Sequence, residues 1–155
     1  MTQTARPVYR ERLAPSLWVL CAAAVAGPMI TLTFTPLGTA LALVIGLAVT
    51  ALIVSGLVLL SPRVRVEDGV LHAGRARIEG EWLGAPVALT AEEARTARGP
   101  ALPATGWHLI RGGIDGVVVV PVQDSDDPAP SWTISTRTPD RLAAAIESIR
   151  SGAAR

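Results

Sequence analysis

The stretch GLVLLSPRVRVEDGVLHAG, from Gly56 to Gly74, decides the organisation of this chain. Its first part is apolar and uncharged, whereas from Arg63 onward arginine or acid alternates with valine. A long apolar run is typical of a helix in hydrocarbon, and a period of two is typical of a strand with one face in water. We therefore expect the chain to leave a membrane near Pro62 and to fold in water beyond it.

The composition agrees with a chain that lies partly in lipid. Half of the 155 residues are hydrophobic and 17% are charged, which is too apolar for a typical soluble domain of this length. All 14 basic residues are arginines, a usage that favours a bacterial genome rich in GC. The net charge of +1 gives no general attraction to nucleic acid, so no nucleic-acid partner is expected.

Two transmembrane helices are predicted before Ser61. No charged residue occurs from Leu17 to Leu60, a run roughly twice as long as one bilayer crossing needs. A turn-like segment around Pro36 divides the run into helices over residues 16–34 and 37–60. Together they predict a transmembrane hairpin over residues 16–60. A signal peptide is the rival interpretation of the first segment, but the apolar run before the lone cysteine is too short for one.

Small residues recur every four positions in both predicted helices. Such residues let helix backbones approach each other in lipid, so they predict a packing surface. Two alternatives stay open at this point: packing within the hairpin, or an interface with a second copy or a partner. The predicted helix-packing residues are Gly38, Ala42, Gly46 and Thr50 in the second helix, and Ala22 and Ala26 in the first.

Arginines flank the two helices, while the turn between them carries no charge. By the positive-inside rule, both ends of the chain lie in the cytoplasm, with residues 1–15 as a cytoplasmic tail. We therefore expect a multi-pass protein of the bacterial cell (inner) membrane. The flanking arginines are Arg6, Arg10 and Arg12 before the first helix and Arg63 and Arg65 after the second. The predicted membrane-surface residues are Arg10, Arg12, Trp18, Arg63 and Arg65.

Residues 61–151 predict a cytoplasmic β-rich domain. Asp68-Gly69 is a strong two-residue hairpin signal, and the register that it sets pairs Arg65 with His72. That register buries one face of the hairpin, formed by Val64, Val66, Leu71 and Ala73, and leaves the arginines on the other face. Five more strands are predicted, over residues 77–82, 85–89, 107–111, 117–122 and 131–136, with a short helix over residues 91–98.

The last predicted element is a helix that begins after Thr138, with Pro139 at its first position. Its apolar stripe packs on the domain. Seven short strands followed by one helix is the order of a pleckstrin-homology-like barrel. The predicted fold class is thus an α+β membrane protein: an N-terminal two-helix transmembrane hairpin, then a small antiparallel β-barrel or sheet with a C-terminal capping helix. The stripe consists of Leu142, Ala145, Ile146 and Ile149.

Three stretches carry a resemblance to a known family. They are YRERL at residues 9–13, RVRVEDGVLHAGRARI at residues 63–78 and DDPAPSWTISTRTPDRLAAAI at residues 126–146. They resemble actinobacterial membrane proteins classed as domain of unknown function 3093. The resemblance implies two membrane helices and a cytoplasmic domain. It implies no activity, so no catalytic residue is carried over to this chain.

The sequence offers no catalytic or metal-binding motif, so neither an enzymatic activity nor a metal or other cofactor is expected. His72 lies beside Arg65 in the predicted hairpin, a poor setting for a metal ligand. The acidic segment 124–128 fails the EF-hand pattern and predicts a solvated turn. Residues 135–137, Ser-Thr-Arg, are a hypothetical anion site at a helix N-terminus, with ordinary capping as the alternative.

The predicted function is a membrane-anchored cytoplasmic interaction module whose partners are the lipid bilayer and a membrane protein or a second copy of the chain. Tethering to a membrane raises the effective concentration of such a domain for membrane partners. Strand edges and the tryptophans Trp82, Trp107 and Trp132 are candidate contact sites, with core packing as their alternative role. The alternative function is an accessory subunit of a membrane transporter or other membrane complex.

Overall fold

The computed structural model describes residues 8–153 of the chain. The described part divides into two compact units. One is the apolar segment Ala14–Ser61, and the other combines the residues up to Leu13 with those from Pro62 onward. The apolar segment is therefore an insertion within a second unit whose chain lies on both sides of it.

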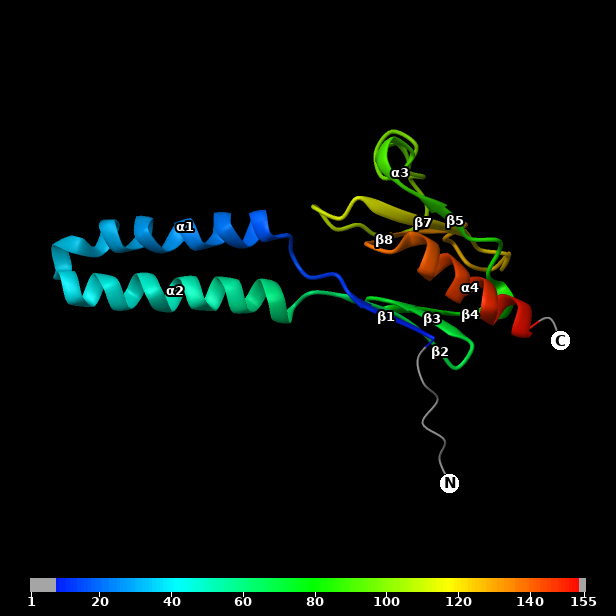
Figure 1. The fold of residues 1–155 in the computed structure, drawn as a ribbon, viewed down its shortest axis with the longest axis horizontal. Coiled ribbons are helices and arrows are strands. Elements are labelled where there is room, and N and C mark those ends of the chain that lie inside the picture. The colour runs from blue at the N-terminus through cyan, green and yellow to red at the C-terminus, as the bar shows by residue number, and fades with distance from the viewer. Residues whose placement is uncertain (1–7, 154–155) are drawn as a thin grey trace, which may run out of the picture. The chain divides into compact units, whose positions relative to one another are not determined.

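The apolar unit is an antiparallel pair of helices, α1 (Leu17–Phe34) and α2 (Thr39–Leu59), joined by the 3₁₀ turn η1 (Thr35–Leu37). Figure 1 shows the two helices side by side along their length. The predicted boundaries agree with these to within two residues. Each of the segments Leu17–Leu37 and Thr39–Leu59 is 21 residues long and apolar enough to cross a membrane. At 1.5 Å per residue each spans about 31 Å, the thickness of a hydrocarbon core.

The first sheet of the other unit has four antiparallel strands in the order β1-β2-β3-β4. The β2–β3 hairpin has the predicted register, with Arg65 opposite His72 and Val66 opposite Leu71. Its turn residues Asp68 and Gly69 have φ angles of 53° and 77°, as a type I′ turn requires. The predicted buried face is confirmed, since all four of its side chains are fully buried. The strands are β1 (Tyr9–Arg12), β2 (Arg63–Glu67), β3 (Val70–Ala73) and β4 (Ala76–Glu79).

Strand β1 corrects the expected boundary of the cytoplasmic tail. The sequence predicts a tail over residues 1–15, yet Tyr9–Arg12 pairs with β2 along its whole length. The pairing continues to Leu13, whose N–H donates to the Pro62 carbonyl at 2.9 Å. The physical reason is the alternation of residues 9–13, which puts Tyr9 and Leu13 on the buried face of the sheet. The two helices are thus inserted between paired strands.

The second sheet has the strand order β5-β7-β8-β6. It is mixed, because β6 runs parallel to β8, with Trp107 opposite Trp132. The expected pleckstrin-homology-like barrel is not seen: the strands form two separate four-stranded sheets, and neither closes. After β4 the chain turns through the 3₁₀ segment η2 (Gly80–Trp82), and β5 pairs with β7 rather than with β4. The strands are β5 (Val87–Leu89), β6 (Trp107–Leu109), β7 (Gly116–Pro121) and β8 (Ser131–Thr136).

Helix α4 (Pro139–Ala153) confirms the predicted C-terminal helix and contacts strands of both sheets, as Figure 1 shows. Its predicted stripe is buried and joins one hydrophobic core with side chains of the two sheets. The short helix α3 (Ala91–Ala97) also has the predicted position. The core residues contributed by strands and loops include Val66, Leu71, Ile78, Leu83, Val118, Val120, Trp132 and Ile134.

Candidate functional site

Four of the five predicted membrane-surface residues share one face of the first sheet. Residues opposite each other in a ladder point to the same side, and side chains two apart along a strand do as well. Arg10 lies opposite Arg65, and Arg12 lies opposite Arg63. Arg65 in turn lies opposite His72 on β3, and His72 lies opposite Arg77 on β4. We call this surface the arginine face: Arg10, Arg12, Arg63, Arg65 and Arg77, with His72 among them.

Charge is unevenly distributed along the arginine face. The end next to residues 13 and 62 holds Arg12 and Arg63, whereas the β2–β3 turn end holds Glu67 and Glu79. Arg65 forms an ion pair with Glu67, at 3.6 Å. The positive end is therefore the end that the chain connects directly to α1 and α2. Trp18, the fifth predicted residue, is 85% exposed in the first turn of α1, and Arg6 lies outside the described residues.

The opposite side of β1 carries a polar cluster that the sequence analysis did not find. The Glu11 carboxylate accepts hydrogen bonds from the Tyr9 and Thr136 hydroxyls, both at 2.6 Å, and from the Arg137 N–H at 3.0 Å. The Arg137 guanidinium lies 3.6 Å from the same carboxylate. The Tyr9 hydroxyl is also 2.9 Å from the hydroxyls of Thr136 and Thr138. We call this group the Glu11 cluster: Tyr9, Glu11, Thr136, Arg137 and Thr138.

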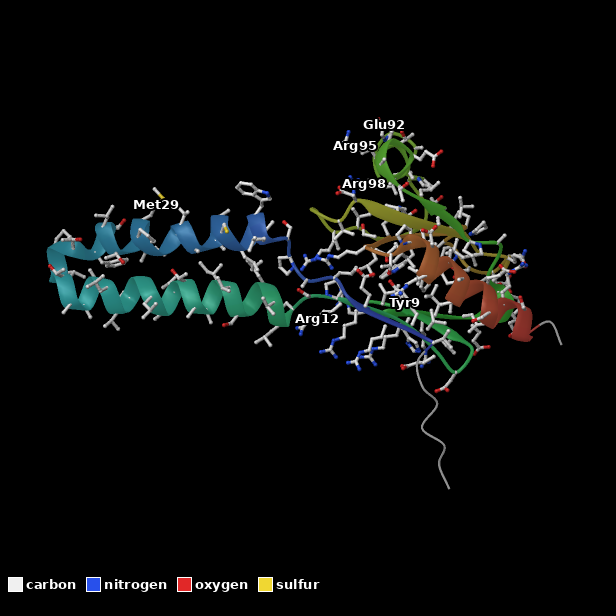
Figure 2. All side chains as sticks on the ribbon, viewed as in Figure 1. Tyr9, Arg12, Met29, Glu92, Arg95 and Arg98 are labelled. Carbon is white, nitrogen blue, oxygen red and sulfur yellow. The ribbon has the colours of Figure 1, made fainter. Side chains whose placement is uncertain are left out.

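The Glu11 cluster fills the hypothetical anion site at the start of α4. Thr136 and Arg137 do hold an anion there, but it is the carboxylate of the chain itself. Ser135 serves elsewhere, since its hydroxyl accepts a hydrogen bond from the Arg111 N–H at 3.1 Å. Figure 2 shows Tyr9 on the side of β1 that faces α4. The signal that could have indicated this strand is the alternation of Tyr9, Glu11 and Leu13 with arginine.

The environment of Tyr9 raises the pKa of its phenol above the usual value of 10.0. Burial is the largest cause, because the phenolate loses hydration. The hydrogen bond to the Glu11 carboxylate acts in the same direction, since a negative neighbour favours the neutral phenol. Tyr9 therefore remains a hydrogen-bond donor at neutral pH and fixes β1 against the β8–α4 junction.

The predicted helix-packing residues divide into two groups. Ala42 and Gly46 are buried between α1 and α2, and Thr50 is half-buried there, with its hydroxyl donating to the Gly46 carbonyl at 2.8 Å. A Cβ at Gly46 would meet the Thr31 hydroxyl and lie 2.9 Å from the Gly27 carbonyl oxygen. The small residues therefore pack within the hairpin. Ala26 is half-buried, whereas Gly38 and Ala22 are exposed. In α1 the buried small residue is Gly27, where an added Cβ would meet the Thr50 side chain.

The remaining candidates are the tryptophans and the acidic segment 124–128. Trp132 is buried and packs against Trp107, with ring centroids 6.1 Å apart, whereas Trp82 is 42% exposed. The acidic segment is a turn, as predicted: the Asp124 and Asp127 carboxylates accept backbone N–H groups two residues ahead. Within residues 8–153 no group of three or more His, Cys, Asp or Glu side chains is arranged to hold a metal ion.

Comparison with known families gives one match. Residues 8–146 match the family described as "Protein of unknown function (DUF3093)". The chain belongs to this family. Membership in DUF3093 confirms the resemblance drawn from the sequence and brings no activity with it. Neither a curated protein nor a solved structure matches the chain. The function of this DUF3093 member must therefore be inferred from its own residues.

Proposed function

We propose that this protein is an interaction module held at the cytoplasmic face of the bacterial inner membrane by its two-helix hairpin, with both termini in the cytoplasm. The observation that carries the proposal is the location of exposed apolar side chains. Among the described residues, all the large ones lie in residues 17–60 except Val8, Trp82, Val87 and Ile110. Figure 2 shows Met29 pointing away from α2. Such a surface is unfavourable in water and suits lipid.

The arginine face supports the proposed orientation. Arg12 precedes α1 by five residues and Arg63 follows α2 by four. An extended chain covers at most about 3.5 Å per residue, so each side chain starts within about 18 Å of a helix end. Arginines at such positions are favoured on the cytoplasmic side. Each that reaches an anionic lipid surface contributes about 1 kcal/mol of attraction. The proposal assigns no catalytic role to any residue.

The second candidate function is an accessory subunit that binds a membrane complex through its two helices. It is favoured by an apolar groove of about 530 Å³ on the hairpin. Gly27 and Gly46 form the narrow part of the pair, which leaves space beside Pro28, Leu43 and Leu47. A helix of a larger membrane complex fits a groove of this kind, because close backbone approach drives helix association in lipid.

A domain-exchange experiment separates the two functions. One variant keeps residues 8–13 and 62–155 but replaces residues 14–61 by an unrelated transmembrane hairpin. The other keeps residues 14–61 and lacks the β-rich unit. Proteins are cross-linked in native membranes and identified with each variant. We expect the partner of the intact chain to follow the β-rich unit. A partner that follows the hairpin alone would assign the accessory-subunit function instead.

The orientation has its own test. A reporter that is active only in the cytoplasm is fused to Arg155, and a second one that is active only outside the cytoplasm is fused at the same site. The proposal expects activity from the first fusion only, with the intact chain in the membrane fraction. Activity of the second fusion, or recovery of the chain in the soluble fraction, contradicts the anchored arrangement.

A further inference from the structure

The outer edge of β1 is a candidate surface for strand pairing. Among residues 8–153, β1 is paired on one side only, because it is the first strand in the order β1-β2-β3-β4. In an antiparallel ladder, hydrogen-bonded pairs alternate with non-bonded pairs. Leu13 bonds to Pro62, so every second residue before it, Glu11 and Tyr9, also directs its N–H and C=O toward β2. The N–H and C=O of Arg10 and Arg12 therefore point to the outer edge. The Arg12 carbonyl does point there, but it already accepts a hydrogen bond from the Arg137 guanidinium at 3.3 Å, so the backbone groups offered to a new strand are those of Arg10.

A groove runs along this edge, between β1 and α4, within the β-rich unit. Its volume is about 770 Å³. The helix wall consists of positions 141, 144, 145 and 148, which lie on one face of α4 at helical spacing. Three of these four side chains, Ala144, Ala145 and Ser148, are small. Small side chains leave room for an additional backbone between the helix and the Arg10 edge.

The charge of the groove selects a kind of partner. Its lining residues include Arg10, Arg137 and Arg141 together with the single carboxylate of Glu11. Arg137 is paired with that carboxylate, so Arg10 and Arg141 supply the net positive charge. Glu11 is already bound within the Glu11 cluster. No hydrogen bond or ion pair formed within residues 8–153 occupies the guanidinium of Arg10 or Arg141. The groove is therefore cationic and complements an acidic chain.

We propose that the β1–α4 groove binds an extended, acidic segment of a partner protein, which pairs with the outer edge of β1 and places carboxylates beside Arg10 and Arg141. Strand addition to an exposed edge is a recurring mode of peptide recognition. A second copy of β1 is the less suitable occupant, because Arg10 and Arg12 of the two copies would repel each other. The inference rests on the proposed function and names the chemistry of its partner.

The probe is a fluorescently labelled peptide of glutamate pairs separated by single valines, so that a paired strand presents carboxylates on both of its faces, toward Arg10 and toward Arg141. A peptide of equal length with lysine pairs in place of the glutamate pairs is its counterpart. Both are titrated against the full chain in neutral detergent micelles at low salt, and binding is followed by fluorescence polarisation. We expect the glutamate peptide to bind about tenfold more tightly than the lysine peptide, because only the first complements the arginines. Binding weakens with added salt. Hydrogen exchange at the Arg10 amide slows on binding, since that N–H joins the new strand pair.

Two substitutions locate the site. Arg141→Glu reverses one charge of the groove, and Ala144→Phe fills the space beside it. Each is expected to weaken binding of the glutamate peptide about tenfold or more. Arg95→Glu is the matched control, because Arg95 is an exposed arginine on α3 and does not line the groove. Urea unfolding of each variant checks that the unit stays folded.

Three results would overturn the inference. The first is equal affinity for the two peptides. The second is an equal loss of affinity for the glutamate peptide with Arg95→Glu and with Arg141→Glu. The third is hydrogen exchange at the Arg10 amide that does not slow when the peptide binds. A concentration-dependent dimer blocked by Ala144→Phe would assign the groove to a second copy. The domain-exchange experiment can assign a partner to the β-rich unit while the two peptides bind equally. In that case the groove proposal is wrong and the proposed function stands.

Discussion

At the scale of single residues, Glu11 joins segments that are far apart in the sequence. It lies on β1, and its hydrogen-bond partners at Thr136 and Arg137 lie more than a hundred residues later. Its side chain is only 13% exposed, so the carboxylate depends on these bonds for its solvation. The arginines on either side of it face the opposite way, so a charge count of residues 9–13 does not show that the acid between them is partly buried.

Replacement of Glu11 by alanine tests this role. Glu11→Ala removes the acceptor for Tyr9, Thr136 and Arg137, so we expect the β-rich unit to lose about 1–3 kcal/mol of unfolding free energy. The control is Glu92→Ala, which removes an ion pair to Arg95 whose acid is 81% exposed and should change stability by less than about 0.5 kcal/mol. Urea unfolding followed by tryptophan fluorescence measures both. Equal effects would contradict the structural role of the cluster.

Tyr9 allows a direct spectroscopic test, because it is the only tyrosine in the chain. Its pKa is raised, so the folded state favours the neutral phenol. The stabilisation that this shift provides is complete below the unfolded pKa of 10.0 and is lost as the pH rises through the folded pKa. Tyrosinate absorbance of the full chain should therefore titrate above 10.0, and in urea it should return to that value. A native midpoint at or below 10.0 contradicts burial of the phenol.

At the scale of elements, local signals located most of the helices and strands. The β2–β3 hairpin was predicted with its register, because Asp68-Gly69 fixes the turn and the alternation fixes the face. The hairpin helices and α4 were located by apolar length and by an amphipathic stripe. Strand β1 and the parallel pairing of β6 with β8 were missed, since both depend on partners distant in sequence.

The close approach of α1 and α2 gives the prediction at this scale. Gly46→Leu forces a side chain against Thr31 and the Gly27 carbonyl, so we expect a cost of about 1–3 kcal/mol. Gly56→Leu is the matched control on the same helix, because a Cβ at Gly56 meets nothing within 4 Å. Thermal unfolding of the full chain in detergent compares the two. Equal midpoints would show that the small residues of α2 do not pack within the hairpin.

At the scale of the whole molecule, the β-rich unit is discontinuous in sequence. Its first strand precedes the helices and the rest follows them, and the two parts meet where Leu13 bonds to Pro62. A fragment that begins at Pro62 therefore lacks β1. It loses the buried side chains of Tyr9 and Leu13, each of which contributes about 2–3 kcal/mol. It also exposes the edge of β2.

This arrangement predicts which soluble fragment folds. A chain in which residues 14–61 are replaced by a short glycine-containing turn should unfold cooperatively in urea, because the turn closes a strand pair that already exists. Residues 62–155 alone should unfold at a lower urea concentration, with a broader transition or none. Urea titration of both fragments, followed by tryptophan fluorescence, makes the comparison. Identical midpoints would contradict the contribution of β1.

The sequence by itself determined the two apolar helices, the β2–β3 hairpin and the amphipathic α4, because each of these depends on periodicity or turn chemistry within a few neighbouring residues. It also placed Arg63 and Arg65 on the exposed face of that hairpin, but not Arg10 and Arg12 beside them. Only the tertiary structure decided that β1 belongs to the first sheet, that the sheets stay separate, and that Glu11 occupies the anion site at the start of α4. These features depend on pairing between segments on opposite sides of a forty-eight-residue insertion, Ala14–Ser61, and no local pattern encodes which distant strand becomes the neighbour.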